Sequence, residues 1–170
     1  MTAVKRADSR EEQLLSLIAQ YELPLKRLCC AYLKDASLAE DAVQETFLKA
    51  YRTMDRFRGD SSAKTWLTRI AINCCKDMLR TPWFRHVDRR LDFSALPPPA
   101  SNADPALIEL AMLVEQLPER ELSVVLLHYD QGMTTREIAA VLRVPQATVS
   151  SRLVSARKRL RAAFEGRDDS

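Results

Sequence analysis

The sequence predicts an all-α protein of two small helical domains joined by a proline-rich linker. Apolar residues recur at helical spacing in several stretches of the 170-residue chain, and no stretch shows the period of two that strands require. Only three glycines occur, which disfavours sheet-rich folds and glycine-rich phosphate loops. The cluster Pro97, Pro98 and Pro99 interrupts the helical pattern and denies that segment a long helix. We therefore expect a domain over residues 1–80, a linker over 81–104, a second domain over 105–164 and a tail over 165–170.

Composition and charge are those of a protein that folds in water. Hydrophobic residues make up 46% of the chain and charged residues 29%, the usual balance of globular proteins, and the formal net charge is +3. No run approaches the roughly 18 consecutive apolar residues of a membrane span. The amino terminus lacks the basic, apolar and small-residue order of a secretion signal. We therefore expect a cytoplasmic protein without a membrane span.

Four helices are expected in the amino-terminal domain. Residues 1–10 are polar and should fray, because chain ends are poorly ordered unless tertiary contacts hold them. Apolar spacing then predicts one helix that starts over 11–19, a second that begins at Pro24, a third over 37–51 and a fourth over about 63–79. The loop MDRFRGDSS between the last two contains two arginines, an aromatic residue and the only glycine of this half. These helices would form a single bundle.

Four cysteines occur as two adjacent pairs, Cys29 with Cys30 and Cys74 with Cys75. Zinc ribbons and redox motifs place two residues between paired thiols, whereas neighbouring side chains on a helix point about 100 degrees apart. We interpret the cysteines as small buried hydrophobic residues. The two histidines of the chain are His86 and His128. Neither has a metal ligand or a catalytic-triad partner near it in the sequence, so both receive the same structural interpretation. No metal or other cofactor is expected.

The carboxy-terminal domain is expected to end in a helix-turn-helix. The helices ahead of it cover residues 105–117 and 118–129, the latter closed by Gly132. In the first helix of the motif, Thr134 and Glu137 can form a capping box, because each side chain can satisfy an unpaired amide. Pro145 suits the start of the second helix, where no amide donor is needed. A turn of about three residues separates the two helices, which is typical of a helix-turn-helix.

The second helix of this motif carries charge of one sign. Between residues 145 and 161 there is no acidic residue, and the basic residues are Arg152, Arg157, Lys158, Arg159 and Arg161. With short polar side chains beside it, such a strip suits a helix in the DNA major groove, its amino end near base edges and its basic end on phosphates. A basic terminal helix can also be a solvated face favoured by the helix dipole. The cap, the short turn and the paired apolar faces favour DNA binding.

Two blocks of the sequence together resemble the extracytoplasmic-function (ECF) sigma factors, the small promoter-recognition subunits of bacterial RNA polymerase. DAVQETFLKAY at 41–51 and FRGDSSAKTWLTRIAINCCKDMLR at 57–80 look like region 2 of that family. LPERELSVVLLHYDQGMTTREIAAVLRVPQATVSSRLVSARKRLR at 117–161 is similar to region 4. The resemblance implies a DNA-binding transcription factor, not an enzyme, that binds core RNA polymerase. It also implies that region 2 melts the minus-ten element, that region 4 reads the minus-thirty-five element, and that an anti-sigma factor controls both.

The resemblance further implies site residues in region 2. The exposed face of the helix over 37–51 would dock on the coiled coil of the largest polymerase subunit, through Asp41, Gln44, Glu45, Phe47 and Lys49. The FRGDSS loop and the helix after it would capture a base flipped from the melted minus-ten strand, which needs an apolar pocket, hydrogen-bond donors and cations. The candidates are Phe57, Arg58, Gly59, Asp60, Ser61, Lys64, Arg69 and Asn73. Trp66 has suitable chemistry too, although a tryptophan on an apolar helical stripe is usually a core residue.

In region 4 the resemblance assigns promoter reading to the second helix of the helix-turn-helix. The residues expected at base edges are Gln146, Ala147, Thr148, Ser150, Ser151 and Ser155, and those on or near phosphates are Arg152, Arg157 and Arg159. Family members often carry a basic residue where this chain has Ser150 and Ser155, which puts a bidentate guanine contact in question. Arg143 replaces the usual turn glycine, so it must adopt an unfavourable backbone angle or shift the turn.

Two other classes of function are open to a helical protein with this motif. A helix-turn-helix repressor or activator would need a dimer surface or ligand domain in place of region 2, and it would bind a palindromic duplex unaided. An enzyme would need convergent titratable groups, whereas the acids here are spread along solvent faces. We favour a sigma factor whose partners are core RNA polymerase, promoter DNA and an anti-sigma factor, with no small-molecule substrate.

Overall fold

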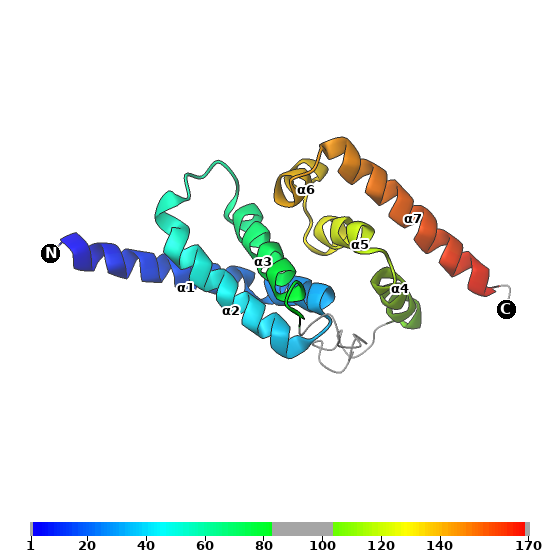
Figure 1. Ribbon diagram of the computed structural model, residues 1–170, viewed down its shortest axis with the longest axis horizontal. Helices are drawn as coiled ribbons and strands as arrows, with labels where there is room; N and C mark the ends of the chain where they lie inside the picture. The colour runs from blue at the N-terminus through cyan, green and yellow to red at the C-terminus, as the bar shows by residue number, and fades with distance from the viewer. Residues whose placement is uncertain (1, 83–103, 169–170) are drawn as a thin grey trace. The chain divides into compact units, whose positions relative to one another are not determined.

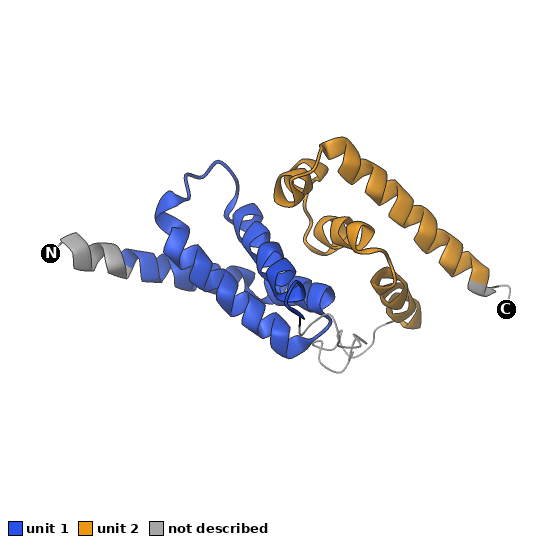
Figure 2. Cartoon of the chain, in the orientation of Figure 1, with its two compact units in different colours: residues 1–96 blue, residues 97–170 orange. Residues whose placement is uncertain are grey.

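A computed structural model describes residues 2–82 and 104–168 of the chain. Every regular element in these ranges is helical, which confirms the all-α class (Figure 1). The chain divides into two compact units, residues 1–96 and 97–170 (Figure 2). The proline cluster of the predicted linker and His86 lie outside the described residues. None of the described helices is long and apolar enough to cross a membrane.

The amino-terminal unit is a bundle of three long helices. Its elements are α1 (Thr2–Leu33), α2 (Ala36–Thr53), the 3-10 turn η1 (Met54–Arg56) and α3 (Ala63–Leu79). Each long helix packs against the other two. The core takes Leu25 and Leu28 from α1, Phe47 from α2, and Leu67 and Ile72 from α3. Burial of one such side chain contributes about 1.5–3 kcal/mol, so these contacts hold the bundle together.

Polar caps set the starts of α2 and α3. Asp35 precedes α2, and its Oδ1 accepts a hydrogen bond from the Leu38 amide at 2.9 Å. Ser62 precedes α3, and its Oγ accepts one from the Thr65 amide at 3.1 Å. Each cap satisfies an amide that has no partner within the helix, which is worth about 1 kcal/mol. The predicted third and fourth helices are confirmed.

Helix α1 corrects two expectations. A break at Pro24 is wrong, because α1 runs through this proline. A proline inside a helix costs about 3 kcal/mol, and the burial of Leu25 and the apolar residues after it offsets that cost. The polar stretch over 2–10 is also part of this helix, and Arg10 at its end holds α1 to α2. Arg10 Nη2 donates to the Tyr51 carbonyl oxygen at 2.6 Å, and its Nη1 lies 3.0 Å from Asp55 Oδ2.

All four cysteines are free and buried, which confirms their interpretation as small core residues. A hydrogen bond with Cys75, together with burial, raises the pKa of the Cys29 thiol. Burial likewise raises the pKa of Cys30 and of Cys74. Metals bind the thiolate, so these protonated thiols are poor ligands. Among the described residues, no group of three or more potential ligand side chains could hold a metal ion.

The carboxy-terminal unit packs four helices and one turn around a smaller core. Its elements are α4 (Pro105–Glu115), α5 (Glu119–Val125), the π-helical turn η4 (Leu126–Asp130), α6 (Thr135–Leu142) and α7 (Gln146–Asp168). Helix α7 packs against α4, α5 and α6. The helix expected over 118–129 is therefore α5 continued by η4, and Gly132 follows it with a positive φ of 64°. Leu127 and Ile138 lie fully inside this unit.

Candidate nucleic-acid interface

Helices α6 and α7 form the predicted helix-turn-helix. Thr134 Oγ1 accepts a hydrogen bond from the Glu137 amide at 3.2 Å, and Glu137 Oε2 accepts one from the Thr134 amide at 2.7 Å. These two bonds confirm the capping box. Gln146 Nε2 also donates to Thr135 Oγ1 at 2.8 Å. The starts of the two helices are thereby joined side chain to side chain.

The turn between α6 and α7 carries the expected unfavourable backbone angle. Arg143 adopts the left-handed conformation, with φ 56° and ψ 47°. The next amide, that of Val144, donates to the Ala139 carbonyl oxygen at 3.2 Å and closes α6. The Pro145 carbonyl oxygen accepts from the Thr148 amide at 3.0 Å and opens α7. A non-glycine residue pays about 1–2 kcal/mol for this conformation, so helix packing rather than local preference fixes the turn.

The first half of α7 has a buried face and an exposed face. Val149, Leu153 and Ala156 are buried and form the apolar stripe of α7, and Leu160, at the next position of the same helical spacing, is half-buried. Of the predicted DNA residues in this half, Thr148 and Arg152 are half-buried, and the exposed ones are Gln146, Ala147, Ser150 and Ser151. Sequence reasoning missed Val154, which is 62% exposed on the same face. The available signal was its place one residue after Leu153, because successive side chains on a helix point about 100 degrees apart.

The three remaining predicted DNA residues of α7 have partners within the protein. Ser155 Oγ donates to Glu121 Oε1 of α5 at 2.7 Å. Arg159 Nε lies 3.1 Å from Glu121 Oε2. Arg157 Nε donates to Tyr129 Oη of η4 at 2.7 Å, with its guanidinium carbon 5.8 Å from the ring centroid. Tyr129 and Glu121 were not predicted, because they lie far from α7 in the sequence.

A second set of candidate residues lies in the loop between η1 and α3. Phe57 and Trp66 stack with ring centroids 4.6 Å apart, so the loop is joined to the first turn of α3. Both rings are half-buried, and Gly59 at the loop tip has a positive φ of 74°. Of the other predicted residues, Arg58 and Asp60 are exposed, and those half-buried are Ser61, Lys64 and Arg69.

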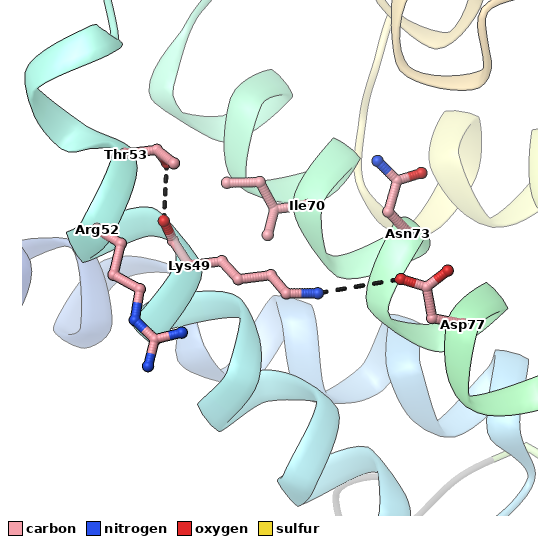
Figure 3. Close-up of a pocket in the computed structure, with 6 residues that line it drawn as sticks. All are labelled: Lys49, Arg52, Thr53, Ile70, Asn73 and Asp77. Atoms are coloured by element: carbon pink, nitrogen blue, oxygen red, sulfur yellow. Dashed lines mark hydrogen bonds and ion pairs between the residues drawn. The ribbon is translucent and has the colours of Figure 1, made fainter.

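An open groove of about 390 Å³ lies along the surface where α2 and α3 pack together (Figure 3). Asn73 is exposed and lines it from α3. The other lining residues are Lys49, Arg52 and Thr53 from α2 and Ile70 and Asp77 from α3. Sequence reasoning named Asn73 and Lys49 but not the rest, because it does not show which turns of two helices face each other. The groove combines an amide, two cations, an apolar side chain, a hydroxyl and a carboxylate.

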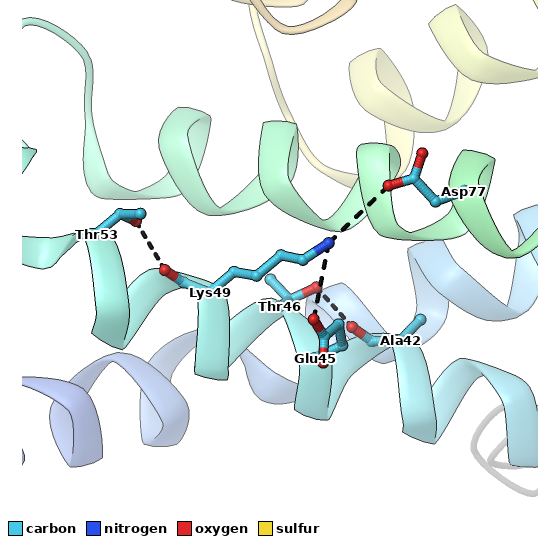
Figure 4. Close-up of polar contacts among 6 residues, drawn as sticks. All are labelled: Ala42, Glu45, Thr46, Lys49, Thr53 and Asp77. Carbon is cyan, nitrogen blue, oxygen red and sulfur yellow. Dashed lines mark hydrogen bonds and ion pairs between the residues drawn. The ribbon is translucent and has the colours of Figure 1, made fainter.

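The Lys49 side chain lies across this groove and not on the outward face of α2. Its Nζ lies 3.8 Å from Glu45 Oε1, one turn earlier, and 4.0 Å from Asp77 Oδ2 on α3 (Figure 4). Two hydroxyl groups on α2 bond back to the helix, Thr46 Oγ1 to the Ala42 carbonyl at 2.6 Å and Thr53 Oγ1 to the Lys49 carbonyl at 2.7 Å. The lysine is thus held between two carboxylates, with its ammonium at the groove.

The outward face of α2 contains part of the predicted polymerase-docking set. Asp41 and Gln44 are exposed, Glu45 is half-buried, and Leu48 is 50% exposed. Phe47 is only 6% exposed and packs in the core, so its side chain does not reach this face. The family resemblance placed Phe47 on this face, and the structure corrects that placement; Leu48, which is exposed there, was not among the predicted residues.

Comparison with known proteins identifies the family that each unit matches. Residues 17–85 match the family described as Sigma-70 region 2, and residues 107–160 match Sigma-70, region 4. The RNA polymerase sigma-H factor of Pseudomonas aeruginosa is 34% identical over 95% of this chain and 90% of its own length. The ECF RNA polymerase sigma-E factor of Salmonella typhimurium is 34% identical over 91% of this chain and 87% of its own length.

A solved structure is similar over the same extent. The sigma factor RpoE from Bartonella quintana, in complex with the anti-sigma factor NepR, has a TM-score of 0.70 and 26% identity. The match covers 93% of this chain and 97% of that chain. Sigma factors are transcription-initiation factors rather than enzymes. With both region families in the expected order and relatives that match along nearly their whole length, the chain belongs to the ECF sigma factors of bacterial RNA polymerase.

Proposed function

We propose that this sigma factor reads one promoter with two surfaces, the outward face of α7 at the minus-thirty-five element and the groove between α2 and α3 at the melted minus-ten strand. The observation that carries the proposal is the groove, where an amide, two cations, an apolar side chain, a hydroxyl and one carboxylate line one opening. The chain makes and breaks no bond. It positions promoter DNA for the polymerase.

The groove has the chemistry to capture a flipped base. The Asn73 amide offers a donor and an acceptor to a base edge, and Ile70 offers an apolar contact to the base. Arg52 would neutralise a phosphate of the single strand, whereas the ammonium of Lys49 is already held between Glu45 and Asp77. Trp66, Ile70 and Asn73 follow one another at helical spacing on α3, so a strand along this stripe would pass from the stacked rings to the groove.

The loop before α3 would hold the strand at the end of this stripe. Phe57 is braced by Trp66, and Gly59, two residues further along the loop, is exposed. Bases stack readily on aromatic rings without sequence preference. Side chains that would contact the strand backbone or bases here are Arg58, Asp60, Ser61, Lys64 and Arg69. The loop would thus contribute affinity, and Asn73 would contribute base selection.

The exposed face at the start of α7 would read the minus-thirty-five element. Gln146, Ala147, Ser150 and Ser151 would meet base edges, with Thr148 beside them. Val154 would add an apolar contact, of the kind that recognises a thymine methyl group. Arg152 and Arg157 would contact phosphates and fix the helix in the major groove.

The outward face of α2 would dock on core RNA polymerase. Asp41, Gln44 and Leu48 share this face at helical spacing, with Glu45 at its margin. An exposed leucine ringed by polar side chains is the arrangement of a protein-binding patch. Phe47 would support the face from inside the bundle.

The domain arrangement and the regulator follow from the family. We place region 2 over 1–80, the linker over 81–104 and region 4 over 105–164, and we expect the chain to work in the cytoplasm beside the polymerase. An anti-sigma factor would hold this chain inactive. Support comes from RpoE, which is similar along almost the whole chain and is bound to the anti-sigma factor NepR.

Run-off transcription tests the proposal directly. Core RNA polymerase is combined with a pool of promoter fragments, with and without this protein, and transcripts are sequenced from their starts. Specific transcripts that require the protein, with two shared upstream elements, are expected. A protein that yields no specific transcript but binds a palindromic duplex unaided would be a repressor or activator instead.

A further inference from the structure

Glu121 is a buried residue of α5 whose carboxylate contacts the recognition helix α7. The residue is 8% exposed. Its Oε1 accepts a hydrogen bond from Ser155 Oγ at 2.7 Å and one from Arg159 Nε at 3.2 Å. Arg159 Nε is also 3.1 Å from Oε2, so the carboxylate and the guanidinium form an ion pair. Ser155 and Arg159 are four residues apart on α7, which puts both on the face that meets Glu121.

The two partners differ in how freely they can leave this contact. A buried carboxylate without its cation is costly, which keeps Arg159 in place. The Arg159 side chain itself is 60% exposed and would be free to reach outward if the carboxylate lost its charge. Lys158 and Arg161, its neighbours on α7, are exposed and make no ion pair with Glu121. The basic end of α7 therefore contains one arginine whose charge is already neutralised.

We propose that Glu121 is a positioning residue that withdraws Ser155 and Arg159 from the DNA-reading surface of α7. The inference rests on the proposed function of α7 as the reader of the minus-thirty-five element. Base reading is then left to the first half of α7, where Ser150, Ser151 and Val154 are exposed. Phosphate contact is left to the other cations of the helix, among them Lys158, which is exposed one turn after Val154 on the same face.

The salt dependence of DNA binding tests this inference. The probe is a labelled duplex that contains the minus-thirty-five element found by run-off transcription, and the protein is the full chain assembled with core RNA polymerase. Glu121→Gln keeps an oxygen for Ser155 but removes the charge that holds Arg159. Released to a phosphate, Arg159 should steepen the slope of log affinity against log salt by about 0.9. That is about a 3.5-fold larger loss of affinity between about 50 and 200 mM salt.

Arg159→Gln is made alone and together with Glu121→Gln, so that the variants form a double-mutant cycle. In the wild-type chain this change should leave the slope unaltered, and in the Glu121→Gln chain it should reverse the increase. Lys158→Gln is the matched control on the same helix and should flatten the slope by about 0.9. A purely structural role for Glu121 would change affinity or melting temperature but not these slopes.

The outcomes separate this inference from the proposed function. A wild-type chain that binds the element and a scrambled duplex equally overturns the promoter-reading function of α7 and the inference with it. If binding is specific, an unchanged slope in folded Glu121→Gln overturns the inference alone. So does a flatter slope in Arg159→Gln matching that of Lys158→Gln, and this arm decides even if Glu121→Gln does not fold.

Discussion

Phe57 and Trp66 lie nearly parallel, with ring centroids 4.6 Å apart and an angle of 22° between their planes. Phe57 belongs to the loop after η1, and Trp66 belongs to α3. Because both rings are half-buried, Trp66 belongs neither wholly to the core nor wholly to the surface. The pair orders the loop that we propose contacts the melted strand.

Phe57→Ala should loosen this loop without unfolding the bundle. An aromatic pair contributes about 0.5–1.5 kcal/mol beyond the area it buries, so a modest loss of stability is expected in denaturant titration. Promoter opening, followed by permanganate reactivity of unpaired thymines, should fall more than binding to core polymerase. Leu15→Ala, at an exposed leucine of α1, is the control. Equal opening by both variants would refute a role for the stacked pair.

Asn73→Ala should impair promoter opening while leaving the fold and polymerase binding intact. The amide is exposed in the groove, so its removal creates no cavity. Loss of a base-edge contact costs about 1–3 kcal/mol, roughly five- to 150-fold in the equilibrium for opening. Gln20→Ala removes an exposed amide from α1 and should have no effect. Unchanged melting of the minus-ten element by Asn73→Ala would count against base capture in the groove.

Leu48→Ala should weaken binding to core polymerase, whereas Phe47→Ala should lower the stability of the fold. Leu48 is half-exposed on the outward face of α2, so its truncation should weaken binding to core polymerase about tenfold, or 1.4 kcal/mol, with little change in stability. Phe47 is buried, and its truncation should cost about 3–5 kcal/mol of unfolding free energy. Competition binding and thermal melting separate the two effects. Leu23→Ala on α1 is the control for an exposed leucine, and equal binding by Leu48→Ala would remove α2 as the docking face.

Randomising Ser150, Ser151 and Val154 should change which minus-thirty-five sequences are transcribed. These side chains are exposed on one face at the start of α7, where base edges are proposed to lie. Sequencing promoter starts from a randomised upstream element gives the preference of each variant. Randomising Ser155, which bonds to Glu121, should alter stability but not preference. If the first library changes only the yield of transcript, these residues dock the helix without reading it.

Stability should fall at alkaline pH because of Cys29. The folded pKa of this thiol is raised by its hydrogen bond with Cys75 and by burial, so folding favours the protonated form. This contribution is fully present below the unfolded pKa of about 8.5 and is lost as pH rises above it, by up to about 1.4 kcal/mol per pH unit. Denaturant titrations between about pH 8 and 10 should show a shallower decline in Cys29→Ala. Parallel declines in the two proteins would show that the thiol does not contribute.

Local signals predicted the parts of the fold that local interactions determine. The capping box at Thr134 and the limits of α3 follow from residues within one turn of each other. The continuation of α1 through Pro24 does not, because it depends on burial against α2 and α3. A proline reads as a helix start when only its neighbours in sequence are considered.

The candidate site divides along the same line. The types of residue in the loop and in α7 were predictable, but their partners were not. Ser155 meets a carboxylate 34 residues earlier in the chain, and Arg157 meets a hydroxyl group 28 residues earlier. The choice between Phe47 and Leu48 likewise depends on how α2 is rotated in the bundle. Periodicity predicts a face for a helix but leaves its orientation uncertain by about one residue.

The left-handed turn at Arg143 bears on how such motifs are recognised. Glycine there would relieve strain of about 1–2 kcal/mol, yet it would also make the unfolded chain more flexible, which costs about 0.5–1 kcal/mol. The second term offsets about half of the first, so glycine is a common solution at this turn and not a requirement. A sequence pattern that insists on it would overlook this DNA-binding domain, whereas one built on the capping box and the buried stripe of α7 would find it.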